Sequence, residues 1–79
     1  MMALIRKMDR ENPNRESIHE EVRKCTYSIF RLSGKKILKL VTYGSHTRKN
    51  PNTSSQTIQF DSNGIKKLRR IIQEYDNHA

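Results

Sequence analysis

The chain has no tryptophan, a single cysteine and few hydrophobic residues, which make up 33% of its 79 positions. With Cys25 alone no intramolecular disulfide can form, and this fits a reducing compartment such as the cytoplasm. No apolar run approaches the roughly 18 residues that a membrane span needs. The first eight residues also lack the apolar stretch of a secretory signal. These absences predict a cytoplasmic protein without a membrane segment.

So few hydrophobic residues allow only a thin core. A chain of this length buries a smaller fraction of its surface than a typical domain does. The core that we expect is one face of a sheet covered by one helix. Small cores of this kind gain stability from a partner subunit. We therefore predict a single domain that forms a homodimer.

Acidic residues are half as numerous as basic ones, 8 against 16, which gives a net charge of +8. The excess lies in residues 31–70, where ten basic residues and one acid, Asp61, give a net charge of +9. A stretch of this charge repels itself unless an anionic partner offsets it. Nucleic acid is the commonest partner of this kind.

Residues 1–16 are polar after Ile5 and are interrupted by Asn12-Pro13-Asn14. We expect them to form a flexible N-terminal arm in front of a domain at residues 17–79. The spacing of Ser17 and Glu20 is typical of a capping box that begins a short helix. The alternative is that residues 18–22 lead directly into a strand, and we favour the short helical turn.

Two segments rich in β-branched and aromatic residues, 24–32 and 36–43, are separated by Ser33-Gly34-Lys35 and predict a hairpin. Residues 56–60 alternate and predict a third strand. Asp61 or Ser62 is expected to cap a helix with one apolar stripe, formed by Ile65, Leu68, Ile71, Ile72 and Tyr75. The fold class predicted is α+β, with an antiparallel three- to four-stranded sheet covered on one face by this C-terminal amphipathic helix.

Side chains that could carry out catalysis or hold a metal are poorly arranged. The three histidines and Cys25 lack the spacing of a ligand pair, and no glycine-rich phosphate loop is present. A metal-dependent nuclease would need clustered carboxylates, whereas residues 31–70 contain one. We therefore predict no catalytic residue, no metal and no cofactor, and a protein that is not an enzyme.

The basic residues suggest a binding surface. Lys39 interrupts an apolar run, so we expect it on the sheet face opposite Leu38 and Leu40, and Arg31 on that same face. Basic side chains follow phosphates while aromatic rings stack on bases, a combination suited to single strands. The helix residues Lys66, Lys67, Arg69 and Arg70 are expected to face solvent. The candidate nucleic-acid-binding residues are Arg31, Lys35, Lys36, Lys39, Tyr43, Arg48 and Lys49.

Residues 27–35, with their Gly-Lys turn, and residues 38–43 resemble two strands of a single-stranded-DNA-binding transcriptional coactivator family, positive cofactor four, and its bacterial relatives. Arg48-Lys49, the strand at 58–60 and the helix at 65–75 continue the resemblance. Segments 42–45 and 55–61 are also similar to small uncharacterised bacterial proteins. The resemblance implies a curved four-stranded sheet and a helix, dimerisation through the helices, and a role in transcription regulation. The first strand of such a sheet would have to come from residues 3–8 or 17–23. The resemblance also implies single-strand contacts at Lys35, Lys39, Tyr43, Arg48 and Lys49.

The same charge allows a second interpretation. A protein-interaction module, of the kind that phages or mobile elements encode, would use a basic surface to dock on an acidic partner protein. The charge would then set the rate and the specificity of the encounter. The sequence leaves this alternative open.

Overall fold

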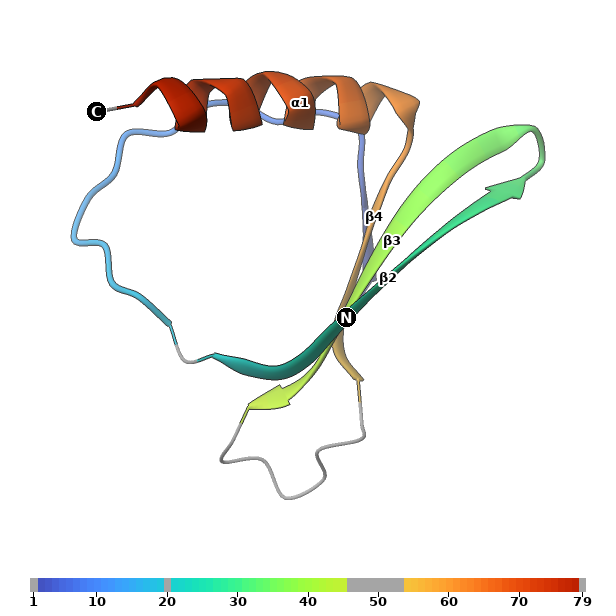
Figure 1. Cartoon of the computed structure of the whole chain (residues 1–79), viewed down its shortest axis with the longest axis horizontal. Helices are drawn as coiled ribbons and strands as arrows, with labels where there is room; N and C mark the ends of the chain where they lie inside the picture. The colour runs from blue at the N-terminus through green and yellow to red at the C-terminus, as the bar shows by residue number, and fades with distance from the viewer. Residues whose placement is uncertain (1, 20, 46–53, 79) are drawn as a thin grey trace.

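The computed structural model describes residues 2–19, 21–45 and 54–78. Four strands form one sheet in the order β1-β4-β3-β2, and a helix follows the last strand and packs on the sheet (Figure 1). The elements are β1 (Met2–Ile5), β2 (Val22–Leu32), β3 (Lys35–Ser45), β4 (Ser54–Phe60) and α1 (Ser62–Asn77). The predicted α+β class, the three predicted strands and the C-terminal helix are confirmed.

The β2–β3 hairpin turns through two residues. Ser33 and Gly34 both have positive φ, 53° and 76°, as in the type I′ turns whose twist matches that of the flanking strands. This turn sets the register, in which Leu32 lies opposite Lys35 and Arg31 opposite Lys36. Because paired residues share a face of the sheet, the turn also decides on which side each basic residue lies.

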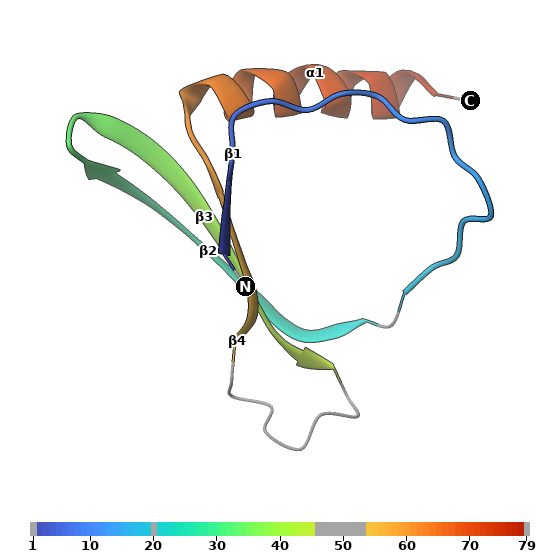
Figure 2. The same cartoon turned by 180° about the vertical axis from the view of Figure 1, so that it is seen from behind.

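The sheet is mixed, so the prediction of a purely antiparallel sheet is wrong for one strand, β1. β1 pairs in parallel with β4, with Met2 opposite Thr57 and Ile5 opposite Phe60. The segment assigned to a flexible arm therefore contributes an edge strand at its beginning (Figure 2). Residues 6–19 and Glu21 lie outside helices and strands. The helical turn that the sequence predicts after Ser17 is not found in the described residues 17–19 and 21.

Helix α1 begins where the sequence indicates. Asp61 is the N-cap, and its carboxylate accepts a hydrogen bond from the Gly64 N–H at 2.9 Å. Near its start α1 contacts β3 and β4, and farther along it lies beside the residues that follow β1 (Figures 1 and 2). Ile65, Leu68 and Ile71 are half-buried. The helix thus covers only part of the sheet.

The two faces of the sheet are defined by the register. Ile29, Leu38, Phe60 and Ile5 lie side by side on the face that α1 contacts, called here the helix face. Residues 37, 39, 41 and 43 of β3 point to the opposite, outer face. The buried hydrophobic residues of the described chain are divided between the faces, with Phe60 on one and Ile37 and Val41 on the other. The core is therefore as thin as the composition indicates.

Candidate nucleic-acid interface

The tip of the β2–β3 hairpin and the start of α1 enclose two adjoining cavities of about 390 and 420 Å³. Lys36 and Ser62 line both of them. Ile29, Leu38 and Ile65 give the first cavity an apolar floor. Around the two cavities stand six exposed basic residues, which we call the basic cleft: Arg6, Arg31, Lys35, Lys36, Lys66 and Arg69.

Three separate segments of the chain contribute to the basic cleft. The hairpin supplies Arg31 and Lys36, which lie opposite each other on the helix face, and the adjacent Lys35. Helix α1 supplies Lys66 and Arg69, which are three residues apart and therefore neighbours on its surface. Arg6 follows directly after β1. The cleft is therefore assembled only when hairpin, helix and N-terminal strand are all in place.

Asp61 is the only acid among the described residues that line the two cavities, and it is already engaged. Its side chain accepts hydrogen bonds from the Gly64 N–H and from Arg6 Nε, both at 2.9 Å. The backbone hydrogen bond from Gly64 lowers the pKa of Asp61 below its ordinary value of 3.8, and the Arg6 charge lowers it further, against the opposing effect of burial. The carboxylate thus holds the helix start and neutralises at most one of the six positive charges.

Asp61 makes the stability of the helix start depend on pH. Because its pKa is lower in the folded chain, the ionised carboxylate stabilises the fold above the ordinary value of 3.8, and this contribution is lost as the pH falls through the folded pKa. Asp61→Asn keeps a good N-cap acceptor but loses the charge. We expect the variant to have a melting temperature several degrees below the original chain at neutral pH, and the gap to close in acid, as the pH falls below 3.8 and through the lower pKa of the folded chain. Thermal unfolding followed by circular dichroism measures both; an equal gap at the two pH values would contradict the assignment.

The predicted site residues do not all come together. Arg31, Lys35 and Lys36 meet in the basic cleft. Lys39 and Tyr43 lie on the outer face, where the Tyr43 ring has the Lys24 ammonium 5.1 Å from its centroid. The expectation that Arg31 and Lys39 share one face is therefore wrong. Arg48 and Lys49 lie outside the described residues.

Three residues of the cleft were missed by sequence reasoning. The sequence predicts Lys66 and Arg69 on a solvated side of the helix, and Arg6 in the flexible arm. One signal was available for the helix residues: the first turn of α1 has no acid, although the helix dipole favours acids there. No comparable signal was available for Arg6, because its position depends on the pairing of β1 with β4.

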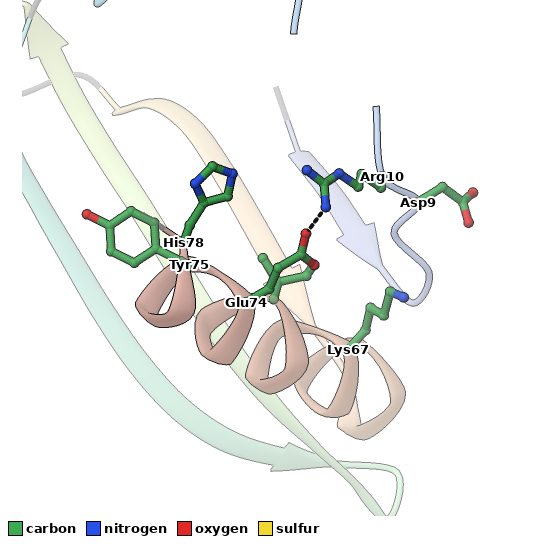
Figure 3. Close-up of a pocket in the computed structure, with 7 residues that line it drawn as sticks. Asp9, Arg10, Lys67, Glu74, Tyr75 and His78 are labelled. Atoms are coloured by element: carbon green, nitrogen blue, oxygen red, sulfur yellow. Dashed lines mark hydrogen bonds and ion pairs between the residues drawn. The ribbon is translucent and has the colours of Figure 1, made fainter. Parts of the chain in front are cut away.

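The second half of α1 forms a different kind of surface with the segment after β1. Asp9, Arg10, Lys67, Glu74, Tyr75 and His78 line a cavity of about 310 Å³ between them (Figure 3). Arg10 forms an ion pair with Glu74 across it. Acids and bases are mixed here, so this cavity does not extend the positive charge of the basic cleft. The ion pair between Arg10 and Glu74 links the segment after β1 to the helix.

No family model, curated protein or solved structure matches the chain. The resemblance to the positive cofactor four family therefore stays a prediction. Among the described residues, no three metal-ligating side chains are grouped to hold an ion, and no described helix is long and apolar enough to cross a membrane. The basic cleft is accordingly the feature of the described residues that bears on function.

Proposed function

We propose that the chain is a non-enzymatic nucleic-acid-binding protein that holds a single strand, preferably of DNA, in the basic cleft. One observation carries the proposal. Six basic side chains from three segments of the chain surround two adjoining cavities, and the one acid among them is already paired. Charges gathered in this way concentrate positive potential, which attracts a polyanion.

The shape of the cleft favours a single strand over a duplex. Next to Lys36 lies the apolar floor of Ile29, Leu38 and Ile65, against which unstacked bases can pack while phosphates contact the basic side chains. The first turns of α1 face the hairpin and the sheet. The side of the helix that lines the first cavity with the hairpin is therefore not free to enter a major groove as a recognition helix does.

The proposal extends to compartment and assembly. Cys25 is a free, exposed cysteine, as is usual for a protein in a reducing environment, and we place the protein in the cytoplasm. The thin core leads us to propose a homodimer.

Titration of fluorescent oligonucleotides tests the binding proposal. Single and double strands of equal length are compared at salt concentrations between about 50 and 200 mM. We expect tighter binding to the single strand, and a logarithm of affinity that falls linearly with the logarithm of salt. With up to six phosphate contacts the slope would reach about −4. Weak binding without this dependence would contradict the proposal and favour the acidic protein partner instead. Equal affinity for the duplex would contradict the preference for single strands.

A further inference from the structure

An apolar surface stays uncovered on the helix face and on α1. Tyr27 and Ile29 of β2 are 73% and 64% exposed, although they lie on the face that the helix contacts. In the second half of α1, Ile72 and Tyr75 are 50% and 79% exposed. Large apolar side chains gathered in this way on a small protein mark a surface that contacts a partner.

The whole chain also exposes more surface than a compact fold of its mass, and residues 6–19, which lie outside helices and strands, contribute to this excess. Its accessible area is 7300 Å², whereas a compact chain of 9.3 kDa exposes about 5000 Å². Its radius of gyration is 14.8 Å, compared with about 12 Å for a compact domain of this length. The chain therefore exposes about 2300 Å² more than a self-sufficient fold of its mass.

Charge is absent from the sheet part of this surface. Two neighbouring rows of the helix face, Tyr27–Leu40–Ile58 and Cys25–Thr42–Gln56, contain no charged residue; we call them the neutral block. The second half of α1, from Ile71 on, contains no lysine or arginine. The basic residues that line a cavity with Tyr75 are Lys67 and Arg10, and Arg10 is paired with Glu74. The net charge of +8 therefore opposes contact between these two parts of different copies only weakly.

We infer that the occupant is a second copy of this chain. The second half of α1 in each copy packs on the neutral block of the other, which gives a self-complementary two-fold interface. If only half of the excess area were covered in each copy, the pair would bury about 2300 Å², which lies in the range of obligate homodimers. The floor of the basic cleft, Ile29 and Leu38, borders the neutral block. The basic side chains of the cleft lie on its far side, toward the hairpin tip and the start of α1, so a copy packed on the neutral block leaves them accessible. This inference names the surfaces of the proposed homodimer, and either it or nucleic-acid binding can fail without the other.

The full chain is examined by sedimentation velocity over a range of concentrations without nucleic acid. We expect a species of twice the chain mass. Ile72→Glu and Tyr75→Ser should weaken self-association at least about 30-fold, as loss of a central interface residue does. Both side chains are exposed in a single copy, so a single copy has little packing there to lose. Leu32→Glu is the matched control, because Leu32 is equally exposed but lies on the outer face.

Cys25 gives a second measurement that needs no variant. It lies in the neutral block and is exposed in a single copy, so its reaction with a thiol reagent should slow as protein concentration rises. A chain that stays monomeric, with Cys25 equally reactive at every concentration, would overturn the inference. A dimer that survives both helix substitutions, or one that Leu32→Glu dissociates as readily, would also overturn it.

Discussion

Gly64→Ala is expected to destabilise the protein by about 1–3 kcal/mol, the range typical of overpacking a well-filled site. In an ordinary helical position the same substitution stabilises by about 0.5–1 kcal/mol, since alanine has the better helix propensity. Gly64 is buried, and a Cβ there would lie 2.2 Å from the carbonyl oxygen of Ile5 and 3.4 Å from the Phe60 ring. The oxygen belongs to the backbone of β1, so it can yield only if the strand moves.

Urea denaturation at one fixed protein concentration measures this effect, since dimer formation would make stability depend on concentration. Asn63→Ala serves as the control, because Asn63 is exposed in the same helical turn. We expect the control to stay within about 0.5 kcal/mol of the original chain. A Gly64→Ala variant as stable as the control would mean that β1 does not pack against the helix start.

Lys36→Gln combined with Arg69→Gln is expected to weaken single-strand binding about 30-fold or more at low salt. The two side chains come from the hairpin and the helix and line the same cavity. Each is taken to contribute one charge-assisted phosphate contact, and two such contacts at somewhat over 1 kcal/mol each give this factor. The slope of log affinity against log salt should become shallower by about 1.4, which is two contacts at about 0.7 each.

The matched control removes one lysine and one arginine from other places. Lys39 lies on the outer face and Arg70 lines neither cavity of the cleft, so Lys39→Gln with Arg70→Gln changes the net charge equally. We expect a loss of affinity of about threefold or less, from the weaker overall field alone. Equal losses in the two double variants would show that binding depends on total charge and not on the cleft.

The parts of the fold that the sequence predicts are those formed by neighbouring residues. The hairpin, β4 and α1 each carry their own local pattern, and Asp61 is a recognisable helix cap. β1 has four residues, and its partner β4 lies at the other end of the chain. Its four residues are all apolar, but so short an apolar run does not by itself indicate a strand. The stability of β1 comes almost wholly from the distant pairing.

The candidate site shows the same division. The positive charge of the hairpin tip follows from composition, but the face on which each charge lies depends on the turn. A turn of two residues places Arg31 opposite Lys36 and on the other side of the sheet from Lys39. The sequence predicts a three-residue turn that includes Lys35, and such a turn would place Arg31 on the same side as Lys39. A shift of one residue in a strand exchanges its faces. The excess of positive charge could thus be predicted from the sequence, whereas the face of the sheet on which each basic side chain lies could not.

The parallel pairing of β1 with β4 sets an order for folding during synthesis. The ribosome makes β1 before β2, β3 and β4, yet its hydrogen-bonding partner β4 is the last of these strands to emerge. Arg6 and Asp61, whose ion pair adjoins this pairing, are 55 residues apart. Contacts over such separations form late because the intervening chain must first be confined. The hairpin can therefore form co-translationally, whereas β1 waits unpaired until β4 has been synthesised.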